Sequence, residues 1–123
     1  MTSSRHRNRP AQATAEARAL LEGQWRRRVD ETVQLELNLH DMRAAITQAS
    51  GGGSLVDVEL LENQLASTRR ALIEVEEALT RVADGSYGQC GACGGAIAPE
   101  RLEVLPEARL CTPCQAAARP LRR

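Results

Sequence analysis

The stretch that decides the fold is "QASGGGSLVD", residues 48–57, where three consecutive glycines interrupt a chain that otherwise favours helices. A run of glycines suits either a flexible linker between domains or the turn of one folded unit. The residues on either side separate these two readings. Before the glycines, apolar or small side chains recur every three or four residues, at Thr32, Leu35, Leu39, Met42, Ile46 and Ala49. After them the same spacing continues through Val58, Leu61, Leu65, Thr68, Leu72, Val75, Leu79 and Val82. Two stripes of similar length predict helices that pack along a heptad seam.

Folding the chain back about the glycines brings the stripes into register, for example Met42 with Leu61 and Leu39 with Leu65. A linker between independent domains would not require this match. The pattern therefore predicts a mainly α fold, with a long antiparallel coiled-coil hairpin over residues 11–84 and its turn at residues 50–54. Ser54 and Asp57 fit a capping box at the start of the second helix, and Gly85 follows Asp84 as a helix stop.

The start of the first helix is less regular than the rest. Its apolar face is broader, through Leu20, Leu21, Trp25, Val29, Val33 and Leu37, which predicts that a third element covers the base of the hairpin. Residues 1–10 are polar and basic and end in a proline, so we expect a disordered tail there.

Composition and charge limit the kinds of fold and partner that the chain can have. One Trp, one Tyr and no Phe in 123 residues argue against a large globular core. Residues 29–84 carry eleven acids and four arginines, a net charge of −7, whereas residues 1–28 carry +5 and residues 85–123 carry +2. An acidic middle is a poor partner for DNA phosphate and suits a basic groove or channel, or is simply a solvated helix surface. The start lacks an apolar signal region and no run is long enough to span a membrane, so we expect a soluble, cytoplasmic protein.

All four cysteines lie near the end of the chain, in two C-x2-C pairs: Cys90, Cys93, Cys111 and Cys114. This spacing is typical of a structural zinc site, because four thiolates close a tetrahedral shell and leave no position for water or substrate. Two disulfides or a redox pair are the alternatives, but a cytosolic protein keeps its thiols reduced and a redox pair leaves the other two cysteines unexplained. We therefore expect one structural Zn²⁺ in a small finger over residues 85–123, with iron in a similar shell as the alternative metal. The finger should contain a short helix begun by Pro99 and a C-terminal helix at the base of the hairpin.

The finger resembles the four-cysteine zinc finger of the DksA/TraR family of bacterial transcription regulators. The matching features are Tyr87-Gly88, the C-x-x-C-G at Cys90 to Gly94, Ile97, Arg101-Leu102, Pro106 and the C-x-x-C-Q at Cys111 to Gln115. With the hairpin included, the resemblance covers most of residues 18–119. It implies a protein that binds RNA polymerase directly, inserts its coiled-coil arm into the secondary channel and modulates initiation, often together with guanosine tetraphosphate.

The sequence departs from the family pattern in two regions, the hairpin tip and the positions implied for guanosine tetraphosphate. Better-known members carry an acidic D-x-x-D-x-A motif at the tip, where this chain has small uncharged residues. The candidate partner-binding residues near the tip are Asp41, Ser50, Gly51, Gly52, Gly53 and Asp57. Asp57 is also explained by helix capping and Asp41 by solvent exposure. Ser67, Glu74 and Gln115 stand where the resemblance implies basic residues for guanosine tetraphosphate, and this argues against nucleotide sensing.

Two other functions remain open on the sequence alone. The finger and the Arg-rich ends would also suit a nucleic-acid-binding protein, although the acidic middle and the scarcity of aromatic side chains make direct DNA binding a poor fit. The hairpin and finger could also form a structural adaptor without transcriptional activity. A closed metal shell and two isolated histidines offer no catalytic constellation, so we do not expect an enzyme.

Overall fold

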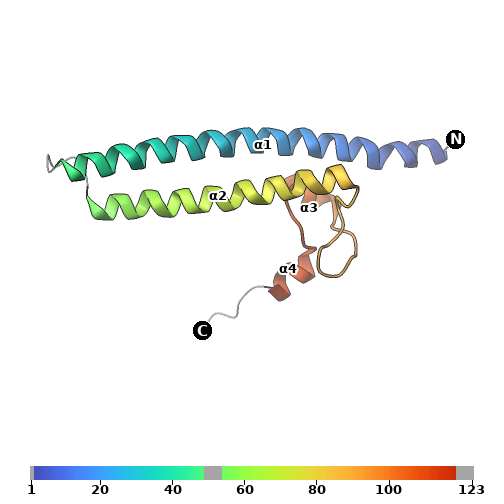
Figure 1. Ribbon diagram of the computed structural model, residues 1–123. Helices are drawn as coiled ribbons and strands as arrows, with labels where there is room; N and C mark the ends of the chain where they lie inside the picture. The colour runs from blue at the N-terminus through green and yellow to red at the C-terminus, as the bar shows by residue number, and fades with distance from the viewer. Residues whose placement is uncertain (1, 49–53, 119–123) are drawn as a thin grey trace. The chain divides into compact units, whose positions relative to one another are not determined.

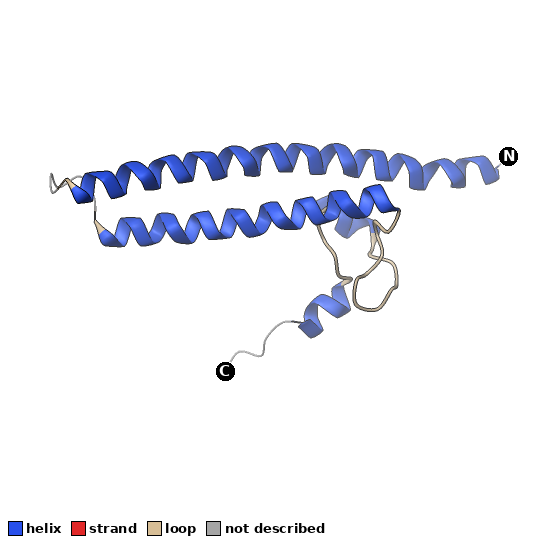
Figure 2. Cartoon of the chain, in the orientation of Figure 1, coloured by secondary structure: helices blue, strands red, loops and turns tan. Residues whose placement is uncertain are grey.

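The computed structural model describes residues 2–48 and 54–118 of the chain, with side chains described from residue 13 onward. Within these ranges the chain forms α1 (Thr2–Thr47), α2 (Leu55–Asp84), α3 (Pro99–Val104) and α4 (Thr112–Ala118). The remaining described segments are loops and turns (Figures 1 and 2), with an isolated antiparallel bridge between Gln89 and Ala96. This confirms the predicted mainly α fold. No described helix is both long enough and apolar enough to cross a membrane.

The chain divides into two compact units, and both long helices contribute to each of them. Residues 24–73 form the first, which we call the arm unit. Residues 1–23 together with residues 74–123 form the second, which we call the finger unit.

The arm unit is a pair of antiparallel helices whose seam follows the predicted stripes. Leu39 and Leu65 are buried, and so is Thr68, whose hydroxyl donates to the Glu31 carboxylate at 3.2 Å. The other stripe positions described on the arm are half-buried: Thr32, Leu35, Met42, Ile46, Val58, Leu61 and Leu72. Two ion pairs join the helices across the seam, Arg43–Glu62 at 2.6 Å and Arg69–Glu36 at 3.0 Å. These contacts confirm the predicted antiparallel register.

Helix α2 begins and ends with the signals that the sequence predicts. The Ser54 hydroxyl oxygen accepts the backbone N–H of Asp57 at 3.1 Å, which satisfies one of the unpaired donors at the helix start. The Asp57 carboxylate in turn accepts the Ser54 hydroxyl proton at 2.9 Å. At the other end Gly85 has a φ of +85°, the left-handed conformation that commonly terminates a helix.

The finger unit contains the cluster that fixes the base of the hairpin. Leu21, Val75, Ala78 and Val82 are buried together, with Leu79 and Tyr87 packed against them. The predicted third element is thus the segment around Tyr87. The C-terminal helix α4 has no buried residue. Much of the broad apolar face on α1 is left uncovered, because Leu20, Val33 and Leu37 are each about half exposed.

The ends of the predicted hairpin differ from expectation or lie outside the description. Helix α1 begins at Thr2, so residues 2–10 are helical where the sequence predicts a disordered tail. Pro10 lies inside this helix and has no backbone N–H, so residues 2–10 are joined to the rest of α1 with one hydrogen bond fewer than a regular helix. The expected turn at residues 50–54 and the candidates Ser50, Gly51, Gly52 and Gly53 lie outside the described residues, apart from Ser54.

Candidate metal centre

The two C-x2-C pairs converge in the finger unit, as their spacing predicts. The sulfur atoms of Cys90, Cys93, Cys111 and Cys114 all lie within 4.8 Å of one another. The Sγ atoms of Cys93 and Cys111, one from each pair, are 3.8 Å apart. All four cysteines are free of disulfide bonds. A tetrahedral Zn²⁺ with Zn–S bonds of about 2.3 Å would separate its sulfur ligands by about 3.8 Å, so this cluster fits the ion.

Local backbone geometry holds the first pair of sulfurs in place. The chain turns tightly after Cys90, whose carbonyl oxygen accepts the N–H of Gly94 at 3.0 Å. Gly94 has a φ of +74°, which a residue with a Cβ rarely adopts. Within this turn the N–H of Ala92 points at the Cys90 sulfur and the N–H of Gly95 at the Cys93 sulfur, each at 3.4 Å. Such N–H groups stabilise thiolates, which are the form that binds zinc.

The second pair is tied to the first through the backbone and a small core. The Gly91 N–H donates to the Arg109 carbonyl oxygen at 2.8 Å, which joins the two knuckles. Cys90, Ile97 and Leu110 are buried together, with Leu102 packed against them. A core of this size buries too little apolar surface to fold a finger alone, so the metal supplies much of the stability.

The pKa values of two cysteines show how unequal the four positions are. Backbone N–H groups of Cys111, Cys93 and Ala92 lower the pKa of Cys90 to about 6. The neighbouring sulfurs of Cys111, Cys90 and Cys93 raise the pKa of Cys114 to about 12. Crowded sulfurs resist ionising together, and a divalent cation at their centre offsets that repulsion. The donor set therefore suits one structural Zn²⁺.

Two hydrogen bonds of the finger unit hold the loop at Pro106 and Glu107, one from the segment just after α2 and one from α2 itself. The Tyr87 hydroxyl donates to the Pro106 carbonyl oxygen at 2.9 Å, and burial of the ring raises the pKa of this hydroxyl. The Arg81 guanidinium donates to the Glu107 carbonyl oxygen at 3.4 Å. These contacts make the metal site part of the structure that supports the base of the hairpin.

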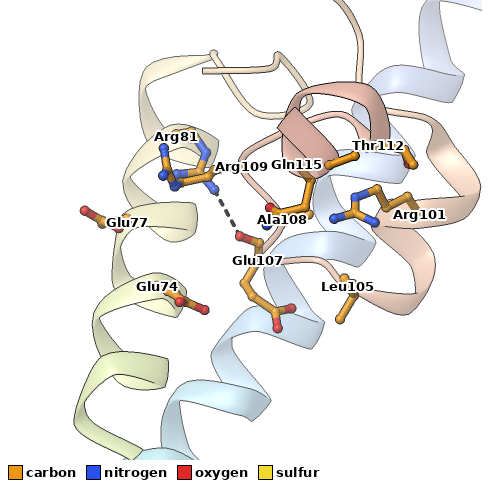
Figure 3. Close-up of a pocket in the computed structure, with 11 residues that line it drawn as sticks. Glu74, Glu77, Arg81, Arg101, Leu105, Glu107, Ala108, Arg109, Thr112 and Gln115 are labelled. Carbon is orange, nitrogen blue, oxygen red and sulfur yellow. Dashed lines mark hydrogen bonds between the residues drawn. The ribbon is translucent and has the colours of Figure 1, made fainter. Parts of the chain in front are cut away.

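Beside these contacts the finger unit has a cavity of about 600 Å³ between α2 and the finger (Figure 3). Its charged lining consists of three carboxylates and three guanidinium groups: Glu74, Glu77, Glu107, Arg81, Arg101 and Arg109. Two of the positions implied for guanosine tetraphosphate, Glu74 and Gln115, line it together. The third, Ser67, lies in a separate groove on the arm unit. The sequence gives no periodic or spacing signal for the arginines of this cavity, because they come from three different segments.

The candidates near the hairpin tip meet in a different place. Asp41 on α1 and Asp57 on α2 line one groove of the arm unit, together with Met42, Leu60 and Leu61. The two carboxylates are 16 positions apart in the sequence, and only the antiparallel register brings them together.

Comparison with known proteins agrees with this geometry. Residues 85–119 match the model of the prokaryotic dksA/traR C4-type zinc finger. The RNA polymerase-binding transcription factor DksA of Escherichia coli K12 is 31% identical over 106 residues, which cover 85% of this chain and 70% of that protein. The chain belongs to the DksA/TraR family.

Two further similarities extend the comparison for this DksA/TraR protein. General stress protein 16O of Bacillus subtilis is 38% identical over 65 residues, but the match covers 40% of that protein and 52% of this chain. The solved structure of transcription factor DksA2 from Pseudomonas aeruginosa superposes with a TM-score of 0.71 at 24% identity, over 85% of this chain and 81% of that one. The latter supports the hairpin-and-finger fold.

Proposed function

We propose that this protein is a zinc-containing transcription regulator that binds RNA polymerase directly and inserts its coiled-coil arm into the secondary channel to modulate initiation. The observation that carries the proposal is the similarity to a DksA named for polymerase binding, which runs through hairpin and finger alike. The protein acts in the cytoplasm, as a binding factor and not as an enzyme.

The charge of residues 29–84, which make up most of the hairpin, supports polymerase as the partner in preference to free DNA. Residues 29–84 carry a net charge of −7, which repels phosphate and favours a channel with basic walls. On the arm, Arg43 and Arg69 are paired with Glu62 and Glu36. These two guanidinium groups are therefore already engaged within the hairpin and are poorly placed to hold a nucleic-acid backbone.

The proposal is tested by site-specific photocrosslinking to the purified RNA polymerase of the same bacterium. A photoreactive residue at Gln48, close to the hairpin turn, should crosslink inside the secondary channel. Adding a different protein that binds in the secondary channel should weaken this crosslink by competition. The matched control carries the photoreactive residue at Val104, an exposed position on α3 of the finger. Absence of any crosslink from Gln48, or a crosslink that the competitor leaves unchanged, would refute insertion.

Guanosine tetraphosphate is not required in the proposed mechanism. Glu74 places a carboxylate in the cavity of Figure 3, where the resemblance implies a basic residue, and Glu77 adds a second. The three guanidinium groups of the cavity are matched by three carboxylates, so its lining has no net positive charge with which to hold a polyphosphate. In vitro transcription with and without the nucleotide tests this, and we expect the same effect of the protein in both. An effect seen only with the nucleotide would overturn it.

A further inference from the structure

The arm unit has a groove that the hairpin does not need for its own folding. It lies between the last turns of α1 and the first turns of α2 and has a volume of about 430 Å³. Met42, Ala45 and Leu61 form a half-buried apolar floor, and Asp41, Asp57 and Leu60 stand at the rim. The floor is continuous with the seam between the helices.

Large apolar side chains are also exposed on the first turns of α2, at and before the groove. Leu60 at the rim is 56% exposed, and Leu55 and Val56 in the preceding turn are 77% and 75% exposed. Three large apolar side chains exposed within two turns of one helix are more than a hairpin requires. Large apolar side chains exposed near one another on a helix are typical of an interaction surface.

This groove also differs in charge from a second groove on the arm. The ion pairs Arg43–Glu62 and Arg69–Glu36 border a separate groove on the arm, so its charges are balanced locally. The groove at the tip has two carboxylates, Asp41 and Asp57, and no cationic residue in its lining. A cationic ligand would therefore meet attraction from both rims, while an anionic one would be repelled from both.

We propose that this groove binds a cationic segment of RNA polymerase, with an apolar side chain between Leu60 and Met42 and arginine or lysine side chains against Asp41 and Asp57. The inference rests on the proposed function and identifies which surface of the arm contacts the enzyme. A second copy of the chain would place carboxylates against carboxylates, and a nucleic acid would place phosphates there. A basic, partly apolar protein segment satisfies both the floor and the rim.

The test compares two double variants for affinity to purified RNA polymerase. Asp41→Asn with Leu60→Ala alters the groove, and Asp30→Asn with Leu37→Ala makes the same chemical changes at exposed positions outside it. We expect the groove variant to bind at least about tenfold more weakly, since centrally placed apolar and charged contacts carry most of an interface's affinity. The control should stay within about twofold. Because all four side chains are exposed, both variants should keep the helicity and melting temperature of the parent.

The outcomes separate this inference from the proposed function. If the parent protein does not bind polymerase, the proposed function and this inference are both wrong. If the parent binds and the two variants bind equally well, the groove is not the contact surface, although the proposed function stands. If the groove variant instead converts a dimer of the free protein to a monomer in sedimentation, the occupant is a second copy and the proposal is wrong. A photoreactive residue at Leu60 should crosslink to a polymerase segment that contains arginine or lysine, and a crosslink to a segment without either would also overturn it.

Discussion

Leu20 and Leu21 are neighbours in α1 with opposite environments. Leu21 is fully buried in the cluster at the base of the hairpin, whereas Leu20 is 51% exposed. We expect Leu21→Ala to reduce the free energy of unfolding of the zinc-loaded protein by about 2–4 kcal/mol, because it removes buried methyl groups and leaves a cavity. Leu20→Ala is the matched control and should change the free energy of unfolding by about 0.5 kcal/mol or less. Urea unfolding followed by circular dichroism measures both, and equal losses would contradict the assigned cluster.

Tyr87 allows a pH-dependent test because it is the sole tyrosine of the chain. Burial raises the pKa of its hydroxyl, so the folded state favours the neutral form. This contribution to stability is fully present below the ordinary pKa of about 10 and is lost as the pH rises through the folded value. Ultraviolet absorbance of tyrosinate should therefore show a midpoint above 10 in the native protein.

The same residue gives an energetic check that does not depend on pH. Tyr87→Phe removes the hydrogen bond to the Pro106 carbonyl while keeping the ring against the Leu21 cluster. We expect a loss of about 1 kcal/mol in the free energy of unfolding at neutral pH. A midpoint at or below 10 together with an unchanged stability in the Phe variant would show that the hydroxyl is solvated.

Among the elements, α2 depends on the capping residue that precedes it, Ser54. Ser54→Ala removes the acceptor for the Asp57 N–H and should cost about 1 kcal/mol of stability, with faster hydrogen exchange in the first turn of α2. Ser54→Asn is the control, because asparagine is an equally good cap and should restore most of the loss. If alanine and asparagine behave alike, the cap does not contribute to the start of the helix.

The two long helices differ in how far their sequence predicts their packing. In α2 every position of the heptad stripe from Val58 to Val82 is buried or half-buried, because the spacing alone selects the side that faces α1. The sequence of α1 predicts less. Its apolar residues spread around the helix, and the structure buries Leu21 but exposes Leu20, Val33 and Leu37. Periodicity cannot predict which of several neighbouring apolar residues is buried when the segment that covers them is a loop, as it is around Tyr87.

The burial of Ala17 and Ala78 could not be predicted from periodicity either. Ala17 and Ala78 are almost fully buried, but alanine is common on both surfaces and interiors of helices and gives little periodic contrast. In the finger, by contrast, the C-x2-C spacing predicts the convergence of Cys90, Cys93, Cys111 and Cys114 directly. The cavity and the tip groove could not be predicted, because each joins residues that only the folded arrangement brings together.

At the scale of the whole molecule, the cysteines and the central part of the hairpin lie in different units. All four sulfurs belong to the finger unit, and residues 24–73 contain no cysteine. The arm unit has its own buried seam through Leu39, Leu65 and Thr68. The arm unit therefore draws its stability from helix packing, whereas the finger unit combines helix packing around Leu21 with metal ligation.

This separation predicts an unequal response to zinc removal. Chelation of zinc, or Cys93→Ser, should leave residues 85–118 without the tetrahedral centre, whose formation is worth about 10 kcal/mol or more in small structural fingers. Hydrogen exchange followed by mass spectrometry should show fast exchange in α3 and α4 and reduced protection around Leu21 and Val75. The seam of the arm, around Leu39 and Leu65, should remain comparatively protected.

Restoring zinc to the chelated parent protein, with one ion per chain by metal analysis, should reverse the change. Equal loss of protection in both units would mean that the arm depends on the metal as well, and unchanged protection in the finger would mean that its small core suffices without zinc.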